Sequence, residues 1–263
     1  MNILVCVKQV PDTTDVKINP ETNTLVREGV VSIINPFDMY AIEEAVRLKE
    51  RFGGESTVIT MGPPQADSAL REALSLGIDK AIHLCDRAFA GSDTWATSVV
   101  LAKAIENIGK FDLIICGIQA SDGDTAQVGP GIAAHLDVPQ ATYVRRIDSV
   151  HMDTEPKIMV VERLLEDGYE ILELQLPALI TVVKEINEPR MPSLRGKMSS
   201  KKAQIPIWGN KELKIEPTQL GLDGSPTRVS KIYTPPQKEG GKVFEGEPQD
   251  VVKALFEEIK DIL

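Results

Sequence analysis

Apolar and polar positions along residues 1–136 follow two alternating patterns. Short, mostly apolar runs indicate buried strands, and between them lie stretches whose apolar residues recur every three or four positions, as in amphipathic helices. The expected strands lie at 3–7, 56–61, 80–84 and 111–116, and the expected helices at 36–52, 65–76, 93–108 and 132–136. This regular alternation predicts an α/β fold with a doubly wound, mostly parallel sheet.

Capping residues support the expected helix boundaries. Asn35 is a good N-cap type, and Pro36 after it suits the first helical position. Ser92 or Asp93 can cap the third helix, and Gly77 and Gly109 follow the second and third helices, where glycine commonly ends them.

The stretch 115–136, which joins a buried strand to an apolar helix through a polar loop, is the best candidate for a ligand site. Such loops lie at the carboxyl end of the sheet, where open α/β folds bind ligands, and free N–H groups at a helix start favour a phosphate. Gly117, Gly123 and Gly129 allow close approach of the backbone. The N-cap types in the loop are Ser121, Asp124 and Thr125. A capped surface turn without a ligand is the alternative.

Two acids in this loop restrict the kind of ligand. Asp122 and Asp124 would repel a bare phosphate. They suit a site in which backbone N–H groups bind the phosphate while the carboxylates bind ribose hydroxyls or cap the helix.

After Pro139 the pattern changes to successive strands, expected at 143–147, 157–164, 169–174 and 180–183. We interpret them as an antiparallel addition to the sheet, which completes an α/β domain over residues 1–187. Residues 188–202 carry two prolines and a basic run, which indicates an exposed loop, with Leu194 as a plausible anchor for a partner. Residues 203–263 have few apolar clusters and are expected to form an extended arm that ends in a helix at 248–262.

Composition excludes several classes of function. The net charge of −10 argues against nucleic acid, which needs clustered Lys and Arg. No apolar run reaches the length of a membrane span, and the N-terminus lacks the features of a signal peptide. The three cysteines form no CxxC pair, so reduced thiols in a cytoplasmic protein are expected. The histidines show no metal-ligand spacing and no nucleophile motif occurs, so we nominate no catalytic residue and no metal site.

Four stretches resemble the β subunit of electron-transfer flavoproteins. They are VCVKQVPD at 5–12, NPFDMYAIEEAVRLKE at 35–50, GIQASDGDTAQVGP at 117–130 and LPALITVVKEINEPRMPSL at 176–194. Together they span most of the chain in the expected order. The resemblance implies an αβ heterodimer in which the β chain holds an adenine nucleotide at the carboxyl ends of its strands and its C-terminal arm embraces the α subunit.

The resemblance also implies site residues. The cofactor-binding positions would be Cys6, Asn35, Pro36, Phe37, Asp38, Met61, Gly117, Gln119, Asp122, Gly123, Asp124, Thr125, Ala126, Gln127 and Val128. The partner-docking positions would be Leu194 with its basic flanks, Arg195 and Lys197.

Family members hold either AMP or a second FAD in the β site. The small residues Gly123, Ala126 and Val128, together with VPDTT at 10–14, resemble the electron-bifurcating group, which implies FAD. Such a member takes electrons from NADH and passes them to the α-subunit flavin with an acyl-CoA dehydrogenase, and to ferredoxin or flavodoxin. Two alternatives remain: an AMP-holding electron shuttle, and a nucleotide-binding regulatory module of the universal-stress type.

Overall fold

The computed structural model describes residues 1–12, 18–19, 24–25, 32–230 and 240–260. It contains two compact units, Met1–Ser230 and Lys231–Leu263. Thr13 and Thr14 of the VPDTT motif lie outside the described residues, as does Ile262 of the expected tail helix.

A nine-stranded sheet forms the centre of the first unit, in the order β11-β10-β9-β12-β8-β1-β6-β7-β13. The strands are β1 (Asn2–Cys6), β6 (Glu55–Met61), β7 (Lys80–Leu84), β8 (Leu113–Gly117), β9 (Gln140–His151), β10 (Ile158–Leu165), β11 (Gly168–Gln175), β12 (Ala178–Val182) and β13 (Ile207–Trp208). The seven strands β9, β12, β8, β1, β6, β7 and β13, taken in sheet order, are each parallel to their neighbours. On the other side of β9, strands β10 and β11 extend the sheet as an antiparallel hairpin. The predicted fold class, a mostly parallel α/β sheet with an antiparallel addition, is confirmed.

The position of β12 differs from our expectation. The sequence predicts that this strand belongs to the antiparallel addition, but it lies between β8 and β9 and runs parallel to both. All of its residues are buried. A short, mostly apolar strand is typical of a central parallel position, because both faces of such a strand are covered.

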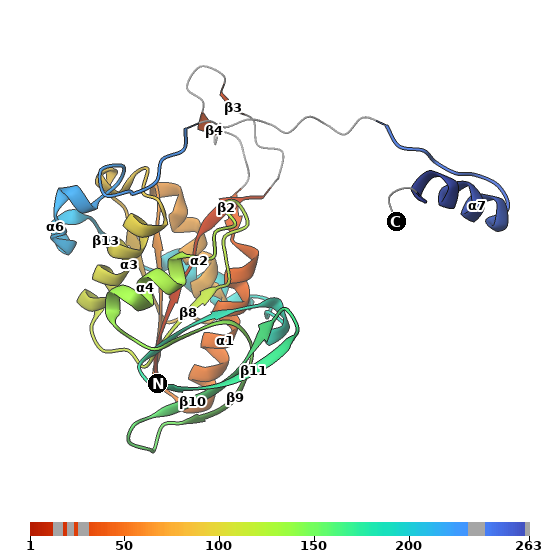
Figure 1. Cartoon of the computed structure of the whole chain (residues 1–263). Helices are drawn as coiled ribbons and strands as arrows, with labels where there is room; N and C mark the ends of the chain where they lie inside the picture. The colour runs from red at the N-terminus through yellow and green to blue at the C-terminus, as the bar shows by residue number, and fades with distance from the viewer. Residues whose placement is uncertain (13–17, 20–23, 26–31, 231–239, 261–263) are drawn as a thin grey trace. The chain divides into compact units, whose positions relative to one another are not determined.

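Four helices cover the two faces of the sheet (Figure 1). They are α1 (Pro36–Phe52), α2 (Asp67–Leu76), α3 (Thr94–Ile108) and α4 (Val128–Leu136). α1 and α2 pack with Ile3 and Val5 of β1 on one face, while α3 and α4 pack with Leu4 and Cys6 on the other. Alternate residues of the strand thus enter two separate cores, as the pleat requires.

Between β1 and α1 the chain forms two small antiparallel pairs. β2 (Gln9–Pro11) pairs with β5 (Ser32–Ile34), and β3 (Ile18–Asn19) pairs with β4 (Thr24–Leu25). The hydrogen bond from Asn35 N–H to the Lys8 carbonyl, 2.8 Å long, continues the first pairing to the start of α1.

Residues 203–230 belong to the first unit and not to an arm that starts at residue 203. β13 pairs with β7 at the sheet edge, and α6 (Asn210–Leu213) follows it. Leu213, Ile215 and Leu220 are buried against the core on the α3 side. The segment has few apolar residues, but these three side chains anchor it to the core beside α3.

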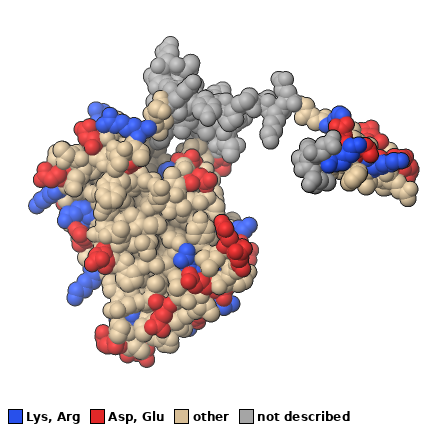
Figure 2. Space-filling view, in the orientation of Figure 1, with Lys and Arg blue, Asp and Glu red and all other residues tan. Residues whose placement is uncertain are grey.

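The second unit contains α7 (Pro248–Ile259), on which Val252, Leu255 and Phe256 are exposed. None of the described helices has the length and apolarity needed to cross a membrane. On the face that Figure 2 presents, acidic and basic side chains are interspersed around a largely uncharged centre.

Candidate functional site

The strand order reverses direction at β1, which makes its carboxyl end the switch point of the sheet. From β1 the chain proceeds to β6 and β7 on one side, then crosses to β8 on the other. Cys6 and Cys116 are register partners on β1 and β8 near their carboxyl ends. In open α/β sheets ligands bind outside such a point, so the loops after these strands form the candidate site.

Asn35 connects the two halves of this site. Its side chain is buried, and its amide donates to Asp38 Oδ1 at 2.9 Å and to the Gln119 carbonyl at 2.7 Å. Its Oδ1 accepts from Ser121 N–H at 3.0 Å. Asn35 occupies the N-cap position, as predicted, but its side chain makes no capping hydrogen bond and binds the loop after β8 instead.

Asp38, in the first turn of α1, is buried beside Asn35. Its Oδ2 accepts from Lys8 N–H at 2.7 Å. Burial raises the pKa of Asp38 to about 7, although hydrogen bonds from Lys8, Asn35 and Gly117 favour its charged form. This carboxyl therefore ties the end of β1 to α1 and titrates near neutral pH.

Gly117 allows α1 to approach β8 at this point. A Cβ on Gly117 would lie 2.7 Å from the carbonyl carbon of Phe37 and 2.9 Å from the nitrogen of Asp38. Both neighbours are backbone atoms and cannot move aside as a flexible side chain would. Any larger residue here would force the start of α1 away from the sheet.

The loop between β8 and α4 contains strained residues and free backbone donors. Asp124 and Ala126 both have positive φ, of 52° and 53°. Such conformations are uncommon outside glycine and concentrate at functional sites. Within the described part of the chain, nothing accepts a hydrogen bond from the N–H groups of Thr125, Ala126 or Gln127. Successive N–H groups in mixed left- and right-handed conformations form concavities that bind anions.

The start of α4 differs from the capping prediction. We expect a side-chain cap from Ser121, Asp124 or Thr125, whereas the helix begins at Val128 and its N-cap residue, Gln127, makes no capping hydrogen bond. Gln127 instead accepts from the Thr94 hydroxyl at 2.7 Å, and Asp124 accepts from the Gln119 amide. No side chain in the described part of the chain caps this helix, which leaves its first N–H groups available to a ligand.

Two further predicted site residues lie at the same edge of the sheet. Cys6 is buried next to Cys116, and the hydrogen bond between them, together with burial, raises the pKa of the Cys116 thiol. Met61, at the end of β6, is half-buried. Both residues are apolar neighbours of the site, and nothing in their surroundings activates a thiol.

Lys8 is a site residue that the sequence reasoning missed. Its ammonium group contacts both carboxylate oxygens of Asp122, at 2.6 and 2.8 Å. Lys8 could have been predicted as a site residue from its position immediately after the first strand, within the VCVKQVPD motif. Thr94, which donates to Gln127, was missed as well because it lies in another helix.

The predicted partner-docking residues lie at the start of a helix and not in a loop. α5 (Leu194–Lys202) packs on α2 and begins at Ser193, whose hydroxyl accepts from Gly196 N–H at 3.0 Å. The Leu194 side chain is 77% exposed, with Met191 and Met198 also exposed nearby. Arg195 and Lys197 are exposed on the same helix. These large apolar side chains beside cations suit a protein partner.

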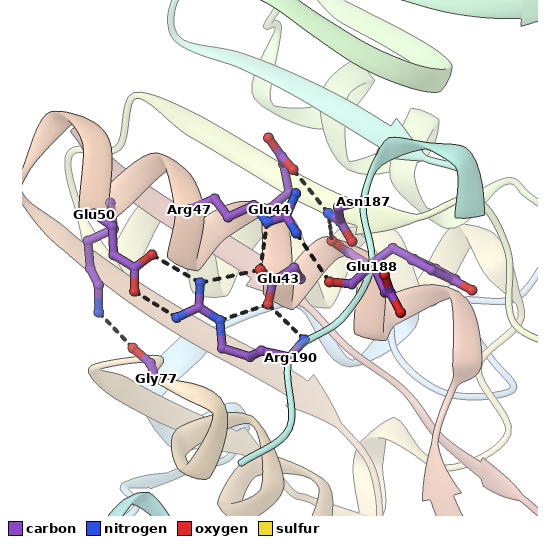
Figure 3. A network of polar contacts seen from close by, with 10 residues as sticks. Glu43, Glu44, Arg47, Glu50, Gly77, Asn187, Glu188 and Arg190 are labelled. Carbon is purple, nitrogen blue, oxygen red and sulfur yellow. Dashed lines mark hydrogen bonds and ion pairs between the residues drawn. The ribbon is translucent and has the colours of Figure 1, made fainter. Parts of the chain in front are cut away.

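A network of charged residues joins the chain before this helix to α1 (Figure 3). Arg190 binds Glu43 and Glu50, while Arg47 binds Glu43 and donates to the Glu188 carbonyl. Burial would raise the pKa of Glu43, but hydrogen bonds from Arg190 and Arg47 outweigh it and lower that pKa. The network fixes residues 188–190 against the helix whose first turn forms part of the candidate site.

A cavity of about 460 Å³ lies at the opposite, amino ends of β1, β6 and β7. Lys80 and Glu55, both in its lining, form an ion pair with each other. Because open α/β sheets bind ligands at the carboxyl ends, we do not place the ligand in this cavity.

The donor set at the switch point fits an adenine nucleotide. Free N–H groups at residues 125–127 suit a phosphate, and Gly123 has nothing within 4 Å of the position a Cβ would take. The carboxylates of Asp122 and Asp124, which contact Lys8 and the Gln119 amide in this structure, are acceptors that suit hydroxyl groups. Among the described residues, no cluster of three or more His, Cys, Asp or Glu could hold a metal ion.

Comparison with known proteins assigns the family. The electron transfer flavoprotein domain matches residues 22–213. An electron transfer flavoprotein subunit beta from Thermoanaerobacterium thermosaccharolyticum is 52% identical over 260 residues, covering 98% of each chain. The caffeyl-CoA reductase-Etf complex subunit CarD from Acetobacterium woodii is 49% identical (99% of this chain, 98% of the relative), and the protein FixA from Azotobacter vinelandii is 47% identical (95% and 90%). The chain therefore belongs to the electron transfer flavoprotein family, as a β-type subunit that pairs with an α subunit.

Proposed function

We propose that this chain holds FAD at the switch point between β1 and β8 and serves in electron bifurcation. The observation that carries the proposal is the loop before α4. It contains two residues with positive φ, Asp124 and Ala126, and its N–H groups at 125–127 have no acceptor within the described residues. Asn35, whose amide also donates to Asp38, holds this loop against the first turn of α1.

The small residues of the loop favour FAD over AMP. Gly123 is surrounded by open space, and Ala126 and Val128 bring little bulk to the start of α4. A dinucleotide needs more room beyond its first phosphate than AMP does. Bound FAD would supply the electron-transfer chemistry, with electrons from NADH passing to the α-subunit flavin and an acyl-CoA dehydrogenase, and to ferredoxin or flavodoxin. The residues of this chain bind and orient the cofactor.

The exposed start of α5 supports a docking role. Leu194 would enter an apolar pocket on the dehydrogenase while Arg195 and Lys197 meet an acidic rim. The name of the Acetobacterium woodii relative places that protein in a complex with a caffeyl-CoA reductase, which supports a partner acting on a CoA ester. We assign α7, with its exposed Val252 and Phe256, to contact with the α subunit in the cytoplasm.

The experiment that tests the proposal is a count of FAD and AMP released from the purified αβ complex. Two FAD and no AMP per complex are expected, followed by NADH oxidation that requires a low-potential acceptor and a dehydrogenase together. One FAD with one AMP would contradict the proposal and identify a simple electron shuttle.

A further inference from the structure

Lys8 lies just after the end of β1, and hydrogen bonds fix both its backbone N–H and its backbone carbonyl. Its N–H donates to Asp38 at 2.7 Å, and its carbonyl accepts from Asn35 N–H at 2.8 Å. These two bonds to buried residues fix the origin of the side chain. The ammonium group can therefore reach only a limited set of partners, and in this structure it reaches Asp122.

The ion pair between Lys8 and Asp122 is easily exchanged. The side chains are 49% and 27% exposed, so water competes for both charges, and exposed ion pairs contribute little stability. The phosphate of AMP and the pyrophosphate of FAD each carry about two negative charges, against one for the Asp122 carboxylate, so either is a strong acceptor for an ammonium group. Only the side-chain torsions of Lys8 would have to change, because its backbone is already fixed.

Asp122 creates a need for such a cation. It lies in the same loop as the free N–H groups of Thr125, Ala126 and Gln127. An unpaired carboxylate there would oppose a phosphate at those N–H groups through charge repulsion. Lys8 neutralises Asp122 when no ligand is bound. After exchange its positive charge lies at the phosphate instead, where it offsets the repulsion between the phosphate and Asp122.

We propose that Lys8 is a phosphate-binding residue of this site, which exchanges Asp122 for a phosphate group when an adenine nucleotide binds. The inference rests on the proposed nucleotide site. In the ligand-free protein the ammonium group binds the carboxylate of Asp122. When the nucleotide is bound, the same group binds a phosphate. The N–H groups of the loop alone do not provide that charge.

The test is a double-mutant cycle on the αβ complex after removal of its nucleotide. Adenosine, AMP and FAD are titrated into the wild type, Lys8→Met, Asp122→Asn and the variant carrying both substitutions, and the dissociation constants are measured by calorimetry. Lys80→Met is the matched control, because Lys80 is an exposed lysine ion-paired to Glu55 at the other end of the sheet. Urea unfolding of each variant shows whether its fold is retained.

Exchange predicts that Lys8→Met weakens binding of AMP and FAD roughly tenfold or more and leaves adenosine unchanged. The effect should be at least as large in the Asp122→Asn background, because Lys8 then has no ion pair to break before it binds the phosphate. If the effect disappears in that background, Lys8 only neutralises Asp122 and the exchange is refuted. Equal binding by wild type and Lys8→Met refutes it too. A wild-type complex that binds neither AMP nor FAD refutes instead the proposed function.

Discussion

The Arg190 guanidinium binds Glu43 of α1, a residue 147 positions earlier in the sequence, with Nε donating to Oε2 at 2.8 Å. The same guanidinium binds both oxygens of Glu50, at 2.6 and 3.0 Å. Glu43 is 4% exposed, so this is a largely buried carboxylate with a cation supplied by a distant segment. The contact fixes the chain that leads to Leu194 against α1, the helix that follows Asn35 and carries Asp38 in its first turn.

Replacing Arg190 with methionine should loosen that chain. Glu43 would remain buried with Arg47 as its remaining cation, and we expect a loss of about 1–3 kcal/mol in the free energy of unfolding. Trypsin cleavage at the exposed Arg195 and Lys197 should become faster, which proteolysis followed by mass spectrometry would measure.

Glu50→Gln is the control for this variant, because Glu50 is 56% exposed and its pair with Arg190 should contribute less than about 1 kcal/mol. Equal cleavage rates in wild type and Arg190→Met would show that the network does not hold the docking segment.

Gly117→Ala should disrupt the candidate site where β8 meets the start of α1. The new methyl group would meet backbone atoms of Phe37 and Asp38, so we expect a destabilisation of at least about 2 kcal/mol and loss of bound nucleotide. Gly123→Ala is the matched control for stability alone, because nothing lies within 4 Å of its Cβ position and its φ is not positive. Thermal unfolding and nucleotide content measure the two effects. A Gly117→Ala complex as stable as Gly123→Ala would rule out the close approach of α1.

Asp38 should make stability depend on pH in a defined direction. Its pKa rises from 3.8 to about 7 on folding, so the folded chain retains a proton that the unfolded chain releases within that range. The contribution is fully present below the unfolded pKa and is lost as the pH rises through the folded one. The stability difference between wild type and Asp38→Asn should fall by roughly 3 kcal/mol from pH 5 to pH 8. Urea unfolding of both proteins across this pH range measures the difference. Stability–pH curves that run parallel for wild type and Asp38→Asn would contradict the prediction.

Leu194→Ala should weaken docking without disturbing the nucleotide. Leu194 is 77% exposed and supports no core, so stability and cofactor content should stay at wild-type values. The KM for the acyl-CoA dehydrogenase should rise about tenfold or more, as for an interface anchor, with kcat little changed. Ser199→Ala, an exposed substitution on the same helix, controls for surface effects. An unchanged KM would exclude Leu194 as an anchor.

Sequence patterns anticipated the elements better than their contacts. The predicted strand at 80–84 and the helix that follows Asn35-Pro36 match β7 and α1. The cap expected at Ser92 or Asp93 is Asp93, whose side chain accepts from Ala96 N–H. Helix α5 was missed, because its exposed basic and polar residues lack an apolar periodicity and its packing on α2 stabilises it.

The sequence by itself determined the alternation of strand and helix over the first half of the chain, the boundaries of α1, α2 and α3, and the glycines at the switch point. Periodicity and capping depend on residues a few positions apart, which is why they can be read from the sequence. Only the tertiary structure decided that β12 lies between β8 and β9, that the Asn35 side chain leaves its own helix to bind the loop, and that Lys8 meets Asp122. Those outcomes depend on segments brought together by burial of the whole sheet. No local pattern specifies which side chains then become neighbours.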